Sequence, residues 1–291
     1  MEEISNEYLK ISINEVGASL TSILSLKRNK ELLYQIEEGS WAFQDVVLFP
    51  LIGKGEYEFN NTYYSFPLRH GLVRDKKFRV IDKSSIVVTL RYESVTEDLA
   101  FYPFKFTFDI TYMLLKNKIV VRTKIYNDND DVQENPLYYS YGSHTGVKAS
   151  SSLGSILLSN TENKEIVFYP LDKNGLIDFD HSVNFLELND NNPNISLNKE
   201  LFKKYDTLVF KNNSDEVILD SGLNYKVKYS FNAPLYAIWS NKDKGEFVCI
   251  EPWWGISNYV NESSSITERL FINKTFNTNE YCYSLEFVFN D

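Results

Sequence analysis

Strict alternation of apolar and polar residues is the feature that most limits what this chain can fold into. In the segment FKFTFDITYML, residues 104–114, every second residue is Phe, Ile, Tyr or Leu, and most residues between them are polar. Successive side chains of a β-strand point to opposite faces, so this period of two predicts a strand with one buried face. Alternation also marks the segments SIVVTLRYE, KIVVRTKIYND, NYKVKYSFN and YCYSLEFVFN, which turn-forming residues separate.

These segments predict an all-β protein built as one large antiparallel β-sandwich with few short helices. A short helix is expected near residues 198–206, in NKELFKKYD. Because no Pro-, Gly- or Ser-rich linker divides the sequence, we expect a single domain over residues 1–291. The Asn- and Asp-rich stretch 172–198 predicts a long loop that crosses the sandwich.

Charge and composition exclude several classes of protein. The chain has 40 acidic and 30 basic residues, and no basic tract that would follow a phosphate backbone, so a nucleic-acid partner is not expected. The acidic first residues do not resemble a signal peptide, and no apolar run has the length of a membrane span, which predicts a cytoplasmic protein without a membrane partner. Cys249 and Cys282 lie in strand-like apolar runs, which favours reduced, buried thiols over a disulfide.

The chain has only three histidines, so each one is informative. His70 lies between two arginines and beside a glycine, whereas His144, in YGSHTGV, follows a strand-like segment and is expected at a strand end. Glycines near both residues would allow a close approach of the backbone to a ligand. The alternatives are a hydrogen-bonded core residue for His144 and a solvated turn for His70. His181 lies among aspartates, which predicts a solvated loop.

The segment CIEPWWGISN places Glu251 at the end of an apolar run, before a proline that is not expected to continue a central strand. Tryptophan rings pack against the apolar face of a pyranose while carboxylates bind its hydroxyls, so this segment favours a sugar site. The alternative is a buried tryptophan pair with Glu251 in a structural ion pair. Adjacent strand residues point in opposite directions, so the sequence leaves open whether Trp253 or Trp254 faces a cleft.

Several kinds of chemistry have no motif here. The histidine and cysteine spacings lack HxH, HxxxH and CxxC, so no metal site is expected. A nucleophile elbow, a phosphate-binding glycine loop and a dinucleotide fingerprint are also missing, which disfavours nucleotide chemistry.

Four segments in order resemble one known family. They are VVLFPLIGKGEYEFNNTYYSFPLRHGLVRDKKFRV, SYGSHTGV, LFKKYDTLVF and CIEPWWGISN, and together they resemble the aldose 1-epimerases, or galactose mutarotases, in particular their LacX-like branch. The resemblance implies a large β-supersandwich whose cleft binds a free sugar. It also implies an isomerase that interconverts α and β anomers without a cofactor or a metal.

The resemblance also implies roles for individual residues. His144 would be the general acid that protonates the ring oxygen, and Glu251 the general base that takes the proton of the C1 hydroxyl. His70 and Arg74 would hold the sugar and its developing charge, and Asp206 would accept hydrogen bonds from ring hydroxyls. The ordinary pKa values of His and Glu, about 6.5 and 4.3, predict a protonated His144 and an ionised Glu251 near neutral pH. We expect the two side chains on opposite sides of one hexose-sized cavity.

Lys54, Arg69 and Trp253 complete the expected substrate site, and Lys54, Arg69, His70 and Arg74 together are expected to form a cationic wall of the cleft. Lys54 stands where the family often has Arg, and Arg69 where it has Gln. Thr145 and Val147 also depart from the family's GGHPAF-like motif, which is expected to loosen the turn that holds His144.

These departures leave open which sugar is the substrate and whether it carries a phosphate. The oligomeric state is also open. The alternatives to an isomerase are a non-catalytic carbohydrate-binding protein that uses the same cleft, and a glycan lyase or hydrolase. No second carboxylate suited to glycoside hydrolysis is evident near Glu251, which disfavours cleavage.

Overall fold

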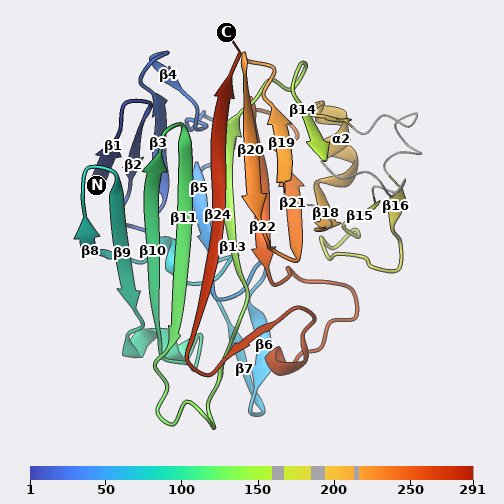
Figure 1. The fold of residues 1–291 in the computed structure, drawn as a ribbon. Helices are drawn as coiled ribbons and strands as arrows, with labels where there is room; N and C mark the ends of the chain where they lie inside the picture. Colours follow the sequence, from blue (N-terminus) through green and yellow to red (C-terminus); the bar gives the residue numbers. More distant parts are fainter. Residues whose placement is uncertain (159–166, 185–193, 213–215, 291) are drawn as a thin grey trace.

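Two antiparallel sheets form the body of the protein. The computed structural model describes residues 1–158, 167–184, 194–212 and 216–290. Within them, a nine-stranded sheet has the order β17 (Asn194–Ser196), β14 (Ser155–Leu158), β19 (Glu216–Asp220), β20 (Tyr225–Phe231), β24 (Thr278–Phe289), β11 (Lys118–Asn127), β10 (Phe106–Leu115), β9 (Val87–Glu93) and β8 (Arg79–Lys83). A seven-stranded sheet has the order β16 (Val183–Asn184), β15 (Val167–Tyr169), β18 (Thr207–Lys211), β21 (Leu235–Trp239), β22 (Phe247–Trp254), β13 (Tyr141–Lys148) and β5 (Asp45–Leu48). In Figure 1 the first sheet lies in front of the second.

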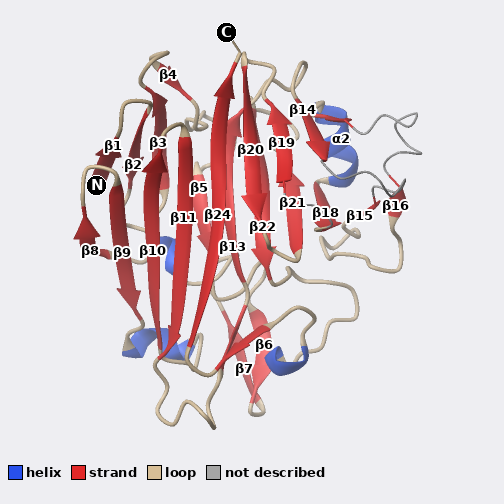
Figure 2. Cartoon of the chain, viewed as in Figure 1, coloured by secondary structure: helices blue, strands red, loops and turns tan. Residues whose placement is uncertain are grey.

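Smaller elements surround the two sheets, and strands outnumber helices throughout the cartoon (Figure 2). A four-stranded sheet contains β1 (Glu2–Ser5), β2 (Leu9–Ile13), β3 (Leu20–Ser25) and β4 (Lys30–Glu31), and two further pairs are β6 (Glu56–Phe59) with β7 (Thr62–Ser65) and β12 (Leu137–Tyr139) with β23 (Asn273–Thr275). Short 3-10 helices are η1 (Val73–Asp75), η2 (Thr96–Ala100) and η3 (Ile266–Glu268). The predicted all-β antiparallel class is therefore confirmed.

The alternating segments form the strands that the sequence predicts. In β10 the side chains of Phe106, Phe108, Ile110, Tyr112 and Leu114 are all buried. The other four segments form β9, β11, β20 and β24, and all five strands lie in the nine-stranded sheet. Local periodicity identified these strands because one face of each packs on the core.

The predicted helix near residues 198–206 is α2 (Lys199–Tyr205). The Asn198 side chain accepts a hydrogen bond from the Leu201 N–H at 2.9 Å, which is the usual N-cap arrangement. Asp206 follows directly, with a positive φ of 56°. The helix therefore ends at a carboxylate.

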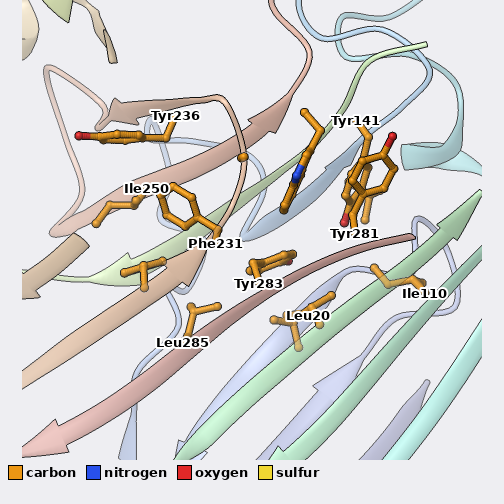
Figure 3. Close-up of a cluster of buried hydrophobic side chains, with 14 of the residues drawn as sticks. Leu20, Ile110, Tyr141, Phe231, Tyr236, Ile250, Tyr281, Tyr283 and Leu285 are labelled. Carbon is orange, nitrogen blue, oxygen red and sulfur yellow. The ribbon is translucent and has the colours of Figure 1, made fainter. Parts of the chain in front are cut away.

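Aromatic side chains join the two large sheets. Tyr141 and Trp254 of the seven-stranded sheet stack with ring centroids 5.4 Å apart, and both pack against Tyr281 of β24. Figure 3 shows Tyr141 beside Tyr281 and Tyr283, with Ile250 and Leu285 in the same cluster. The cluster of buried residues reaches from Ile4 to Phe287. This shared core favours the predicted single domain.

Two expectations are corrected outside the site. The stretch 172–198 is not one loop, because its described part contains β16 and β17; residues 185–193 lie outside the described residues. Cys249 is buried as expected, but Cys282 points from the outer face of β24 and is exposed; both thiols are free.

His181 is solvated as predicted, with its side chain 81% exposed and Nδ1 2.7 Å from Asp178 Oδ2. Of the helices in the described ranges, none has both the length and the apolar character of a membrane span.

Candidate active site

His144 and Glu251 meet because of the register between β13 and β22. These antiparallel strands pair Gly142 with Trp253 and Gly146 with Cys249. Counting two residues inward from each pair places His144 directly opposite Glu251. Directly opposed residues point to the same face of a sheet and lie within side-chain reach. Tyr141 and Trp254, on the other face, fill the core between the sheets, so His144 and Glu251 face away from it.

The ladder between the two strands is interrupted at this point. Residues 143–145 of β13 and 250–252 of β22 are not paired with each other, although β13–β22 pairs continue on both sides of them and both segments pair with their other neighbours, β5 and β21. Pro252 lies in this interval and has no N–H to donate. The expectation that Pro252 ends a strand is wrong, because β22 continues to Trp254 and lies between β21 and β13. His144 is likewise in the middle of β13, not at a strand end.

Two glycines make room for aromatic rings beside His144. A Cβ on Gly142 would lie 2.9 Å from Trp253 Cδ1, and a Cβ on Gly146 would lie 2.9 Å from Trp41 Cζ3. Both glycines are two residues from His144 and share its face of the strand. Their role is therefore to admit two indole rings, not to form the turn expected from the sequence. Thr145 and Val147 lie in the same continuous strand and are buried, so they do not loosen a turn.

The catalytic candidates contact each other directly. His144 Nε2 lies 3.3 Å from Glu251 Oε1, and their side chains are only 10% and 3% exposed. Glu251 Oε2 accepts a hydrogen bond from the Trp253 indole N–H at 3.3 Å. The expectation that the pair faces each other across a sugar-sized gap is corrected, since the two groups are adjacent in one wall of the cavity.

Burial controls the protonation of this pair. It lowers the pKa of His144 well below its ordinary value, and the neighbouring His70 and Arg74 act in the same direction. Burial also raises the pKa of Glu251 well above its ordinary value, against the opposing effect of the Trp253 hydrogen bond. Both shifts favour a neutral imidazole beside a protonated carboxyl. This reverses the sequence-based expectation of an imidazolium beside a carboxylate, because the sequence does not reveal how deeply the pair is buried.

His70 approaches the pair from a strained loop. Its φ is 69°, its N–H donates to Gly53 O at 2.6 Å, and its Nδ1 accepts from the Gly53 N–H at 3.2 Å. The His70 and His144 rings meet edge to face with centroids 6.1 Å apart. Burial, with help from Arg69 and Arg74, lowers the pKa of His70 to about 3. His70 is therefore neutral at pH 7, and because Nδ1 is an acceptor, Nε2 carries the proton.

A cavity of about 250 Å³ opens in front of these residues, close to the lower end of the ~300–1,000 Å³ range of small-molecule sites. Six of the predicted residues line it: Arg69, His70, His144, Asp206, Glu251 and Trp253. Asp206 comes from the end of α2, and its carboxylate accepts from the Thr207 hydroxyl at 3.2 Å. The question of the two tryptophans is thereby answered, since Trp253 lines the cavity and Trp254 lies in the core.

Two predicted residues lie outside this lining. The Lys54 side chain is exposed, and its backbone N–H donates to Asn258 Oδ1 at 2.6 Å. Arg74 places its guanidinium over the Phe43 ring, 4.3 Å from the centroid, and donates from Nη1 to Arg69 O. The expected cationic wall is therefore wrong in composition. Of the four residues expected in this wall, only Arg69 and His70 line the cavity. His70 is neutral, so Arg69 supplies the positive charge, and Arg74 instead supports the Arg69 backbone.

Other lining residues escaped sequence analysis. The most prominent are Trp41, Trp239, Thr207, Ser257, Leu171 and Ile177. Trp41 comes from the loop before β5, and its ring stacks on the His144 ring with centroids 4.7 Å apart and an angle of 22°. Only the scarcity of tryptophan, four in 291 residues, could have drawn attention to it. Among the described residues, no group of three or more His, Cys, Asp or Glu side chains is arranged to hold a metal ion.

Sequence comparisons identify relatives along nearly the whole chain. The sequence model of the family described as aldose 1-epimerase matches residues 2–270. The chromosomal protein LacX of Lactococcus lactis subsp. lactis is 26% identical over 289 residues, which cover 94% of this chain and 93% of LacX. The plasmid form of LacX from the same organism has the same identity and coverage.

Solved structures share the fold. A galactose mutarotase related enzyme from Lactobacillus acidophilus has a TM-score of 0.89 at 24% identity, covering 100% of this chain and 97% of its own. A galactose mutarotase-like protein from Lactobacillus casei ATCC 334 has a TM-score of 0.88 at 21% identity, with 99% of both chains covered. Galactose 1-epimerase from Lactobacillus acidophilus NCFM has a TM-score of 0.73 at 11% identity and covers 99% of this chain and 93% of its own. The predicted supersandwich of the galactose mutarotase type is thus confirmed.

Proposed function

Because this chain belongs to the aldose 1-epimerase family, we propose that it interconverts the α and β anomers of a free aldose, with His144 as general acid and Glu251 as general base. The observation that carries the proposal is the His144–Glu251 contact of 3.3 Å in the wall of a cavity of sugar size. The His70, Asp206 and Trp253 side chains line the same cavity and offer a donor, an acceptor and an aromatic surface.

The proposed reaction moves one proton in each direction. Glu251 takes the proton of the C1 hydroxyl while His144 donates its proton to the ring oxygen O5, and the C1–O5 bond breaks to leave an open-chain aldehyde. Rotation about C1–C2 then presents the other face of the aldehyde. In the reverse step O5 attacks C1, His144 takes back the O5 proton, and Glu251 returns its proton to O1. Atoms and charges balance without another reactant, so the proposed reaction includes no cofactor.

Direct contact between the acid and the base suits this substrate. O1 and O5 are bonded to the same carbon, so one edge of the sugar presents both oxygens side by side. Adjacent side chains on neighbouring strands can then address one oxygen each. After ring opening, the proton lies on Glu251 and His144 is neutral. Burial favours this distribution in the resting protein as well, so ring opening starts from the less favoured form of the pair, in which His144 carries the proton and Glu251 is ionised. The surrounding protein therefore stabilises the open-chain state relative to an exposed pair.

Other lining residues would orient the sugar. His70, neutral with a proton on Nε2, would donate a hydrogen bond to a ring hydroxyl or to O1. Asp206 would accept from hydroxyls, as expected from the family resemblance. The Trp253 ring would pack on the apolar face of the pyranose.

The direct test is the relaxation of freshly dissolved α-D-glucose or α-D-galactose, followed by polarimetry or by NMR exchange. The proposal predicts relaxation faster than in buffer, in proportion to protein concentration. A non-catalytic carbohydrate-binding protein would bind the sugar saturably and leave relaxation unchanged. Release of reducing ends from a polymer, without faster anomerisation, would instead support a glycan-cleaving enzyme.

The pH dependence of kcat/KM tests the protonation of the pair. The active pair holds one proton, and two coupled groups titrate as a unit. With ordinary pKa values, this state would span only about pH 4.3 to 6.5. Because burial lowers the pKa of His144 and raises that of Glu251, we expect a plateau that extends beyond both limits. The acid limb then marks proton uptake by His144, and the alkaline limb marks proton loss from Glu251. A tenfold fall per pH unit directly above about pH 6.5 would contradict this assignment.

A hexose phosphate is the second candidate substrate. Arg69 favours it, because this residue lines the cavity and no ion pair of Arg69 occurs within the described ranges. The Asp206 carboxylate in the same cavity disfavours an added anion, so we expect the neutral sugar to react faster. Measurement of kcat/KM for glucose and glucose 6-phosphate compares the two. Arg69→Gln should lower the value for the phosphate about tenfold or more, and the value for glucose less, since a charged hydrogen bond is lost only with the phosphate.

A further inference from the structure

Trp41 has no role in the reaction proposed above, yet its ring centroid lies 4.7 Å from that of His144, nearer than Trp239 at 5.3 Å or His70 at 6.1 Å. Its indole ring lies face to face with the imidazole at 4.7 Å and 22°, while Trp239 meets the imidazole at 73°. Neighbouring rings hold Trp41 in place. It stacks on Phe247 with centroids 5.6 Å apart, and its backbone carbonyl accepts a hydrogen bond from the Tyr34 hydroxyl at 3.3 Å.

The chain also preserves the space that this stacking requires. Gly146 lies on the His144 strand, and any side chain there would press on the Trp41 ring, since a Cβ would be 2.9 Å from Cζ3. The Gly146 N–H donates to Gln44 O at 2.8 Å, and its carbonyl accepts from the Tyr34 N–H at 2.8 Å, so this strand fixes both sides of the Trp41 loop. Loop and strand therefore hold the two stacked rings in register.

The face of an indole attracts a cation at this distance. Around His144, the titratable or charged groups are Glu251 and Cys249 on β22, Asp45 on β5, His70, Arg69 and Arg74 on the loop and η1, and Asp206 after α2. Burial, His70 and Arg74 all disfavour an imidazolium. Cys249 is buried with a raised pKa and carries no charge, and Asp45 bonds to Thr145 from the opposite side of β13. The Trp41 ring is thus an uncharged group that favours the protonated form.

We propose that Trp41 is a positioning residue for the reaction: its indole face holds the imidazole of His144 toward Glu251 and stabilises the imidazolium that donates to O5. This inference rests on the proposed acid role of His144, but its physical content, a stabilised imidazolium, is independent of catalysis. Phe at this position would keep a stacked ring with a weaker attraction for cations, whereas Leu would keep apolar bulk without a π face.

The test compares wild type, Trp41→Phe and Trp41→Leu by ¹⁵N NMR titration of His144, with His144→Gln to assign the signal. We expect the imidazole to titrate at lower pH in Trp41→Leu than in wild type, with Trp41→Phe between them. In anomerisation, kcat should fall in the same order, about tenfold for Trp41→Leu, with little change in KM. Trp254→Phe, which replaces an indole stacked on Tyr141 in the core, is the matched control and should leave the His144 titration unchanged.

Other outcomes would overturn the proposal. Identical His144 titrations in the three proteins would show that the indole face does not stabilise the imidazolium. An increased KM with unchanged kcat would show that Trp41 is a sugar contact instead. Gly146→Ala gives a second route, since it displaces the Trp41 ring without removing it, and we expect it to shift the titration in the same direction. Loss of the proposed activity in wild type would leave the NMR comparison intact, so the two proposals fail separately.

Discussion

Glu251→Gln is expected to lower kcat/KM for anomerisation by about 10²–10⁴, because the proposed general base is removed while the shape of the side chain is kept. The amide oxygen of Gln still accepts the Trp253 indole N–H, which now bonds Glu251 Oε2. Sugar binding, measured by calorimetry or by saturation-transfer NMR, should therefore be retained. Burial opposes the charge of this carboxyl, so the variant should be at least as stable to urea as wild type.

His144→Gln should cause a loss of similar size, and the double variant should be little worse than either single variant, because the two groups act as one unit. Glu280→Gln is the matched control. It removes an exposed carboxylate on β24 that pairs with Lys124 at 3.4 Å, and its rate should equal that of wild type. If anomerisation survives both Glu251→Gln and His144→Gln, the assigned roles are wrong even if the activity is correct.

The second large effect is expected on stability, at Asp45. This carboxyl is buried between the sheets, where it accepts hydrogen bonds from the Leu20 N–H at 2.8 Å and the Thr145 hydroxyl at 2.6 Å. Burial raises its pKa to about 6, against the effect of both hydrogen bonds. Its unfolded pKa is about 3.9, so the unfolded chain binds fewer protons between these two values. The Asp45 contribution to stability is therefore complete below about pH 4 and is lost as the pH rises through 6.

Asp45→Asn removes this titration while keeping a group of the same shape. The free energy of unfolding of the variant, relative to wild type, should rise by roughly 3 kcal/mol between pH 4 and pH 7, from a shift of about two units at 1.36 kcal/mol per unit. Urea unfolding at pH 4, 5, 6 and 7 measures it. Asp82→Asn, on the exposed strand β8, should follow the wild-type curve at every pH. Parallel curves for wild type and Asp45→Asn would contradict a raised pKa.

The sequence predicted the elements whose signal is local. Alternation located β9, β10, β11, β20 and β24, and the Asn198 cap located α2, because these patterns depend on residues a few positions apart. His144, Glu251, His70 and Asp206 were identified from motifs, and they do line one cavity. Their roles remain proposals.

Features that depend on distant strands could not be predicted. The contact between His144 and Glu251 follows from the register of β13 with β22, and the position of Trp41 follows from a loop that only the fold brings over Gly146. Protonation was predicted in the wrong direction for the same reason, since the burial of His144 depends on residues from several elements. Lys54 and Arg74 are predicted in the site by motif alone, and neither lines the cavity.

The origin of the acid and the base on paired strands has a consequence for how this scaffold could diversify. The register of β13 with β22 cannot change in small steps, because the insertion of one residue in either strand would turn the His144 or the Glu251 side chain to the opposite face of the sheet. Leu171, Ile177, Asp206 and Arg69, by contrast, belong to connecting segments or element ends, where length and composition vary at low cost. Selection for a new sugar could therefore remodel the rim of the cavity repeatedly, while the proposed acid and base stay on their paired strands.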